Sequence, residues 1–297
     1  MTDAELSKKL GRWQAIESLG ILGGIICIIA ACLLAIVLYD IIILSILSFA
    51  GTAFFLLMAL PAKKKKKVLI QEQFGGYFRA ELAKFFGAEP DVPELPIDES
   101  FLKNSELICF SWTKCSIEDF HEGIYNGLRF SAANAELSRT IEERTSPRED
   151  DWMTRSETLF RGIVLRCQNI CNPALHLTLN DRFQKRTESD ITDPAVFRQY
   201  FAARCADGRC DDEVTTPALR ELVQKLEVIA RGRVCGLSLK NGSMTLALET
   251  KYVFATIPAS HDLRDIDGIR RWFTASLTGM TNLLNLLKNS PALTTNH

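Results

Sequence analysis

The stretch Leu19–Leu60 reads LGILGGIICIIAACLLAIVLYDIIILSILSFAGTAFFLLMAL and contains one charged side chain, Asp40, among forty-two residues. A helix that crosses the hydrocarbon core of a bilayer needs about 20 apolar residues. Leu19–Leu38 and Ile41–Leu60 each supply twenty, and Tyr39–Asp40 separates them. The stretch therefore predicts a membrane α-helical hairpin, with two spans joined by a tight turn.

Positive charges on both flanks predict the orientation of this hairpin. Lys8, Lys9 and Arg12 precede the first span and Lys63–Lys67 follows the second, whereas the turn has no Lys or Arg. Basic residues beside short membrane segments stay on the cytoplasmic side. We therefore expect both termini and the soluble part to be cytoplasmic. A cleaved signal peptide is disfavoured, because the apolar stretch is too long and starts behind a polar segment.

The residues next to the spans are expected to touch the membrane surface. Residues 1–18 form an amphipathic N-terminal segment, in which Leu6, Leu10 and Trp13 recur at helical spacing. The lysine run suits anionic headgroups, although it also fits a flank without lipid specificity. The expected surface contacts are Trp13, Lys63, Lys64, Lys65, Lys66 and Lys67.

Small residues line one face of the first span, including Gly20, Gly23, Gly24 and Cys27. Such a face lets two helices approach closely in lipid. We expect it to pack the hairpin on itself, and the alternative is a homo-oligomer formed through the same face.

Beyond the hairpin, residues 61–98 predict a basic flank, a stalk helix and a proline-containing linker. Residues 99–297 predict a cytosolic α+β domain with a mainly antiparallel sheet, because runs of strands alternate with helices. Residues 68–297 contain 27 basic and 32 acidic side chains, a net charge of −5. This acidic balance argues against nucleic acid as a partner, since phosphate binding needs a basic surface.

The clearest local pattern in the soluble part is a hairpin with a two-residue turn at Asn241–Gly242. Pairing around this turn sets Leu239 opposite Met244, Leu237 opposite Leu246 and Cys235 opposite Leu248. Other expected strands are Leu107–Trp112, a strand around Leu128–Ala132, Thr158–Cys167 and a strand through Leu175–Leu179. Ser116–Asp119 is expected to start a helix or turn, with further turns at Gly123 and Asn126–Gly127. Ile141–Glu157 is expected to be an exposed loop or hairpin arm. Helices are expected after Asp193, after Thr216 and over Leu263–Lys288.

The order of these pieces resembles a bacterial two-transmembrane family catalogued as domain of unknown function thirty-one thirty-seven. The most distinctive motifs are Glu118–Gly123, Phe160-Arg161-Gly162 and Thr216–Leu219. The resemblance implies a multi-pass protein of the bacterial inner membrane with a cytoplasmic α+β domain. It implies no activity and no catalytic residues, and it suggests a LemA-family membrane protein as a partner.

The densest titratable cluster is Glu118, Asp119, His121 and Glu122. Carboxylates beside an imidazole can bind a metal or perform acid–base catalysis, but charged turns before strands are also common. Asp262, beside His261, is expected to cap the last helix. Neither a nucleophile elbow nor a phosphate-binding glycine loop occurs.

Nine cysteines are a high number for this length. In a reducing cytoplasm disulfides are not expected, so buried reduced thiols are the main interpretation. Alternatives are a redox switch and a metal site, whose candidate ligands are Cys167, Cys171, Cys205 and Cys210.

The sequence therefore predicts a membrane-anchored scaffold or assembly module that binds lipid bilayer and protein and uses no cofactor. The alternatives are a membrane-tethered hydrolase that uses the Glu118–Glu122 cluster and a metal- or redox-responsive membrane protein.

Overall fold

A computed structural model describes residues 3–37, 42–88, 90, 93–144, 152–173, 175–182, 191–205, 215–250, 254–255, 257 and 261–294. The chain forms two compact units. The first, unit 1, comprises Met1–Ala80 and Ile257–Trp272, and the second, unit 2, comprises Glu81–Thr256 and Phe273–His297. A segment near the end of the sequence thus belongs with its beginning.

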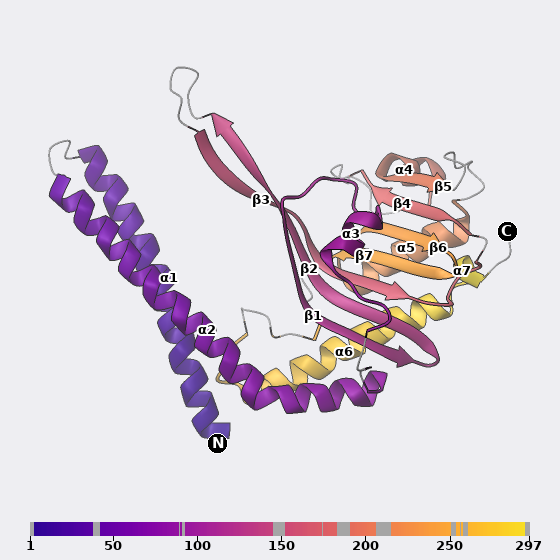
Figure 1. Cartoon of the computed structure of the whole chain (residues 1–297), viewed down its shortest axis with the longest axis horizontal. Coiled ribbons are helices and arrows are strands. Elements are labelled where there is room, and N and C mark those ends of the chain that lie inside the picture. Colours follow the sequence, from indigo (N-terminus) through magenta and orange to yellow (C-terminus); the bar gives the residue numbers. More distant parts are fainter. Residues whose placement is uncertain are drawn as a thin grey trace. The chain divides into compact units, whose positions relative to one another are not determined.

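Unit 1 is built on two long helices, α1 (Asp3–Val37) and α2 (Ile42–Phe86), of which α2 continues into unit 2 (Figure 1). The predicted amphipathic segment and first span form the single helix α1. The predicted basic flank and stalk helix likewise continue the second apolar segment, despite Pro61. Proline removes one helical hydrogen bond, but the alanine, leucine and lysine residues around it favour helix.

One helical segment within the described residues, Asp3–Ala30, is long and apolar enough to cross a membrane. This finding rests on length and composition, and a signal sequence would pass the same test. The same criterion does not support the second predicted span.

The small face of α1 packs against α2. A Cβ atom added at Gly20 would lie 2.8 Å from the Phe55 carbonyl oxygen, and one at Gly23 would lie 2.6 Å from the Phe55 ring. A Cβ atom added at Gly51 of α2 would lie 3.2 Å from the Cys27 sulfur of α1. The glycines therefore bring the two helices close together, as predicted for a hairpin packed on itself.

The first turns of α1 pack against protein. Leu6 and Leu10 are 5% and 0% exposed. They belong to an apolar cluster whose other buried members are Phe74, Leu263, Ile266 and Ile269. This cluster explains the helical spacing of the leucines without a membrane surface.

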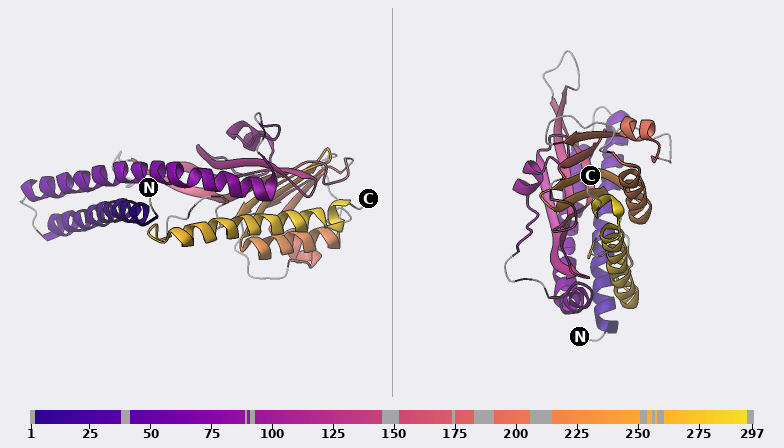
Figure 2. Two further views of the ribbon diagram at one scale, coloured as in Figure 1. Left: turned by 90° about the horizontal axis from the view of Figure 1, so that it is seen from below. Right: turned by 90° about the vertical axis from the view of Figure 1, so that its right-hand side faces the viewer.

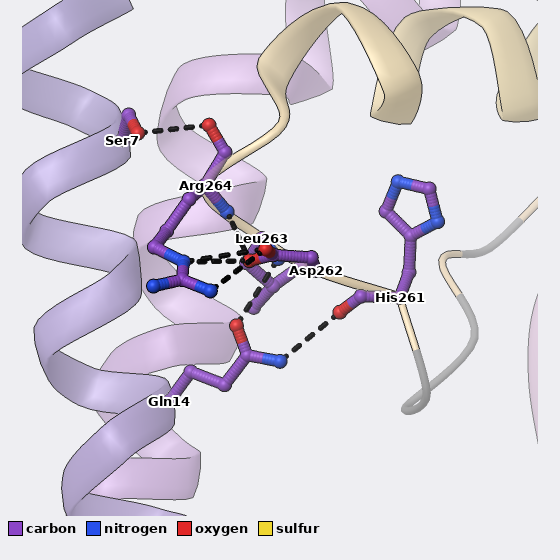
Figure 3. Close-up of polar contacts among 6 residues, drawn as sticks. All are labelled: Ser7, Gln14, His261, Asp262, Leu263 and Arg264. Carbon is purple, nitrogen blue, oxygen red and sulfur yellow. Dashed lines mark hydrogen bonds and ion pairs between the residues drawn. The ribbon is translucent and has the colours of Figure 1, made fainter.

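Polar contacts reinforce the same packing (Figure 3). The Gln14 side-chain amide donates to the His261 carbonyl at 3.1 Å and accepts from the Leu263 N–H at 3.1 Å. The Ser7 hydroxyl donates to the Arg264 carbonyl at 2.8 Å. These contacts join residues about 250 positions apart, so no local sequence pattern could reveal them.

Unit 2 contains a seven-stranded sheet in the order β1-β2-β3-β7-β6-β4-β5 (Figure 1), and every strand pair in it is antiparallel. The predicted α+β class with an antiparallel sheet is confirmed. The strands are β1 (Lys114–Tyr125), β2 (Leu128–Arg144), β3 (Trp152–Cys167), β4 (Leu177–Asp181), β5 (Phe201–Cys205), β6 (Arg233–Lys240) and β7 (Ser243–Glu249). The helices beyond α2 are α3 (Glu99–Asn104), α4 (Pro194–Tyr200), α5 (Pro217–Ala230), α6 (Ile266–Lys288) and α7 (Pro291–Thr294).

Helices cover both faces of this sheet, as Figure 2 shows for α3 on one face and α5 with the later turns of α6 on the other. The face under α3 carries an apolar cluster that includes Leu102, Ala133, Phe160, Val164 and Ala247. Because strand residues alternate between faces, the neighbouring buried residues of β3 and β7 pack on the side of α5 and α6. A sheet buried on both faces explains the many apolar positions in its central strands.

Several local predictions are confirmed. The Thr216 hydroxyl caps α5 by accepting from the Leu219 N–H at 3.3 Å. Asn241 and Gly242 have φ values of 54° and 76°, and Leu239 and Leu237 pair with Met244 and Leu246 as predicted. The pairing of Cys235 with Leu248 is wrong: a bulge lies between Val234 and Gly236, so Val234 faces Leu248 instead.

Other local predictions are also wrong. Leu107–Trp112 is irregular, because its apolar side chains cover the sheet and the Asn180 amide holds the Leu107 carbonyl at 3.0 Å. Ser116–Asp119 lies within β1, and Gly123 is paired with Phe130 inside that strand rather than in a turn. The turn at Asn126–Gly127 does join β1 to β2.

The strands β2 and β3 continue beyond the sheet as a two-stranded ribbon, seen in Figure 1. The strand β1 pairs with β2 no further than Ser138, and β7 pairs with β3 no further than Gly162. Beyond these points β2 and β3 pair with each other, from Arg139 opposite Glu157 to Arg144 opposite Trp152. We call Arg139–Arg144 with Trp152–Glu157 the β2–β3 ribbon. Of the two structures predicted for Ile141–Glu157, an exposed loop or a hairpin arm, the described residues form the hairpin arm.

Candidate functional site

The strand β1 carries all four residues of the predicted carboxylate–imidazole cluster, but it does not bring them together. A bulge lies between Glu118 and His121, and Asp119 within it has a φ of 53°. Glu118 and Asp119 are exposed, whereas His121 and Glu122 are 4% and 1% exposed. Neighbouring strand residues point to opposite faces. The buried imidazole and carboxylate therefore do not share a pocket.

His121 lies among aromatic rings. Its ring centroid is 5.8 Å from that of Phe86, 6.4 Å from Phe130 and 6.5 Å from Phe254. Burial lowers the pKa of His121 to about 4, because the charged imidazolium would lose its hydration there. The Nε2 atom has no hydrogen-bond partner within the described part of the chain. A neutral ring in an apolar cluster acts as a core side chain.

Glu122 holds the proline-containing linker against the other face of the sheet. Its Oε2 atom accepts from the Glu94 N–H at 2.9 Å and from the Leu95 N–H at 3.0 Å. The Ser131 hydroxyl donates to the Leu95 carbonyl at 2.7 Å. Glu122 and Ser131 thus provide hydrogen-bond partners for the backbone N–H and C=O groups of an irregular segment, which is a structural role.

The His261-Asp262 pair belongs to a turn before α6. The Asp262 carboxylate binds the Arg264 guanidinium, a hydrogen-bonded pairing that lowers the pKa of Asp262. The predicted helix cap is wrong, because Asp265 caps α6 by accepting from the Gly268 N–H at 2.8 Å. His176, in the predicted strand through Leu175–Leu179, lies just before β4, which begins at Leu177.

The cysteine candidates do not form a metal site in the part of the chain that the structure describes, where no group of three possible ligands occurs. Cys167 and Cys171 are free and buried, and burial raises the pKa of both thiols. Cys205 is disulfide-bonded, contrary to the expectation of reduced thiols. Cys210 lies outside the described residues.

The predicted membrane-surface residues do meet in space. The Lys65 Nζ atom lies 4.8 Å from the centre of the Trp13 ring, in a cation–π contact between α2 and α1. Lys66 forms an ion pair with Glu17 of α1. The same part of the two helices encloses a groove of about 620 Å³.

The three motifs that carry the family resemblance have structural explanations. A Cβ atom on Gly123 would lie 2.7 Å from the Phe86 carbonyl oxygen, so the end of α2 rests on β1. A Cβ atom on Gly162 would lie 1.8 Å from the Leu248 carbonyl oxygen of β7. Thr216 caps α5. Each motif secures packing, and none of them assembles a catalytic group.

Comparisons with protein-family models, with curated proteins and with solved structures found no match for this chain. The family resemblance stays a prediction.

Proposed function

We propose that this chain is a two-span protein of the bacterial inner membrane whose cytoplasmic part binds another protein, as a scaffold or assembly factor. The observation that carries the binding proposal is the β2–β3 ribbon. The sequence predicted an arm or a loop here, but it could not show that two strands stay paired beyond the sheet.

The packing inside unit 1 supports an anchor with two spans. Gln14 and Ser7 of α1 contact residues 261–264, so these two parts of the chain lie on the same side of any membrane. If α1 crosses the bilayer after Gln14, the chain must cross an even number of times before residue 261. The segment Ile41–Leu60 is the other apolar stretch of twenty residues in the sequence. The basic flanks favour the cytoplasm as the shared side.

The β2–β3 ribbon suits a protein partner. An isolated two-stranded ribbon is marginally stable in water, and the outer edges of its strands carry backbone groups that can pair with a further strand. A partner that adds a strand satisfies those groups and buries the ribbon. The ion pair between Arg139 and Glu157, at 2.9 Å, holds the ribbon together at its base.

No observation favours the hydrolase alternative, because the Glu118–Glu122 cluster is divided between solvent and two faces of the sheet. The protein-binding function therefore remains the one that the geometry supports best.

Removal of the β2–β3 ribbon tests this function. In the full chain, Arg139–Glu157 is replaced by Asn-Gly, which joins the paired residues Ser138 and Thr158 with a tight turn. Tagged wild-type protein is purified from native membranes in mild detergent, and the proteins that accompany it are quantified. We expect a specific partner with the wild type and at least about a tenfold loss without the ribbon, since about 2 kcal/mol of binding free energy corresponds to more than tenfold in affinity. A LemA-family protein is the first candidate to look for.

The matched control exchanges the ion pair, with Arg139→Glu and Glu157→Arg in one chain. It keeps the ribbon and its net charge, so partner recovery is expected to persist. Equal recovery of the partner protein with the wild type and with the variant that lacks the ribbon would show that the ribbon is not the binding site.

A further inference from the structure

The groove between α1 and α2 gathers positive charge around an aromatic ring. Its wall includes Lys9, Arg12 and Trp13 from α1 and Lys64, Lys65 and Glu72 from α2. Four cations and one anion give it a net charge of 4 − 1 = +3. The groove needs both helices, so neither the lysine run nor the first turns of α1 would form it alone.

Three of these cations are available to a ligand. Lys65 lies over the Trp13 ring, and the neighbouring Lys66 is already paired with Glu17. Lys9, Arg12 and Lys64, in contrast, have no ion pair with any residue that the structure describes. An arginine fork beside lysine ammonium groups is the donor set that a phosphate ester prefers.

The position of the groove along the helices matches the headgroup layer. Trp13 precedes Leu19, the first apolar residue of the hairpin, by six residues, and Lys64 follows Leu60 by four. At about 1.5 Å per residue these intervals are roughly 9 Å and 6 Å. The headgroup region extends about 5–8 Å beyond the hydrocarbon core on each side. A tryptophan ring at this depth is typical of membrane proteins.

We propose that this groove binds the headgroup phosphate of an anionic phospholipid. Arg12, Lys9 and Lys64 contact the phosphate oxygens, and the Trp13 ring packs beside them at the depth of the headgroups. The bound lipid links α1 to α2 at the membrane surface, next to the cluster that holds Ile257–Trp272 in unit 1. The proposal rests on the membrane anchorage proposed above and is independent of partner binding.

The test compares two double variants of the full chain in detergent. Lys9→Ala with Lys64→Ala removes one groove cation from each helix. Lys8→Ala with Lys63→Ala removes the same charge from exposed neighbours that do not line the groove. Thermal unfolding is followed during titration with short-chain phosphatidylglycerol, phosphatidylcholine or inorganic phosphate. Each lysine near the surface is worth about 1 kcal/mol, which corresponds to roughly fivefold in affinity.

We expect phosphatidylglycerol to stabilise the wild type and the Lys8/Lys63 variant with similar affinity, and the Lys9/Lys64 variant with roughly 25-fold weaker affinity. The Glu72→Gln variant, which removes the one anion among the groove residues, is expected to bind phosphatidylglycerol about fivefold more tightly than the wild type does. It keeps the proposal testable if the Lys9/Lys64 variant does not fold.

Three results would overturn the proposal. Equal weakening in both double variants would mean unspecific attraction to a polybasic segment. Equal stabilisation by inorganic phosphate would mean that the occupant is not a lipid, and no response to phosphatidylglycerol would mean that the groove binds no headgroup. Flotation with phosphatidylcholine vesicles is measured separately, because its failure would contradict the membrane anchorage itself.

Discussion

Replacement of Arg233 by methionine is expected to lower the free energy of unfolding of unit 2 by about 3–5 kcal/mol. Arg233 at the start of β6 binds both carboxylate oxygens of Asp181 at the end of β4. The Asp181 side chain is 1% exposed. This hydrogen bonding raises the pKa of Arg233. Methionine keeps most of the side-chain volume but removes the guanidinium that binds this buried carboxylate. Denaturant unfolding of the full chain, followed by near-ultraviolet circular dichroism, measures the loss.

The double variant Asp181→Leu with Arg233→Met is the control. Replacing both partners of a buried pair by apolar side chains is often close to neutral. We therefore expect it to recover most of the stability that Arg233→Met loses. A double variant as unstable as the single one would show that the pair contributes through packing and not through charge.

Acidification from pH 7 to pH 4 is expected to destabilise unit 2 by about 3 kcal/mol through His121 alone, from about 1.4 kcal/mol per pKa unit. The pKa of His121 is lowered to about 4 in the folded protein, from an unfolded value of 6.5. Between these two values the unfolded chain takes up a proton that the folded chain does not. Stability from this residue is therefore complete above pH 6.5, falls as the pH drops, and is lost at about pH 4.

The variant His121→Phe isolates this contribution, because phenylalanine fills the aromatic cluster without titrating. Its stability is expected to vary less between pH 6.5 and pH 4 than that of the wild type. Tyr125→Phe is the control, since it changes another side chain that contacts the same Phe86 ring and leaves His121 in place. The same pH dependence in wild type and His121→Phe would show that the imidazole is accessible to protons in the folded state.

Local patterns predicted much of the fold. The Asn-Gly turn, the helix after Thr216 and the strand over Thr158–Cys167 each rest on neighbouring residues, and each is confirmed. The class with an antiparallel sheet follows from the same short-range patterns. Bulges escaped prediction, because a single extra residue at Cys235 shifts the register without changing the composition.

Long-range packing could not be predicted from the sequence. Leu6 and Leu10 have the spacing of a surface helix, but their partners Leu263, Ile266 and Ile269 lie at the other end of the chain. A helix that buries Leu6 and Leu10 against protein and one that buries them in a membrane surface have the same spacing of apolar residues in the sequence. The run Leu107–Trp112 was mistaken for a strand for a similar reason, since apolar side chains that cover a sheet resemble those within one.

The candidate sites show the same limit. The proximity of Glu118, Asp119, His121 and Glu122 in sequence suggested a shared site, but strand alternation and a bulge separate them. The sequence predicted part of the basic groove, because it indicates Trp13 and the lysine run as membrane-surface residues. It did not predict that they line one groove. Their meeting across two helices depends on the close approach at Gly20 and Gly23.

The most direct test of the membrane anchor is the side on which the two ends of the full chain lie. A fluorescent protein that matures only in the cytoplasm, and a phosphatase active only in the periplasm, are fused in turn to each terminus. If α1 crosses a membrane, its contacts with residues 261–270 put these two parts of the chain on one side, and the proposed orientation makes that side the cytoplasm. The account therefore predicts fluorescence and no phosphatase activity at both termini. Phosphatase activity at the carboxyl terminus would contradict it.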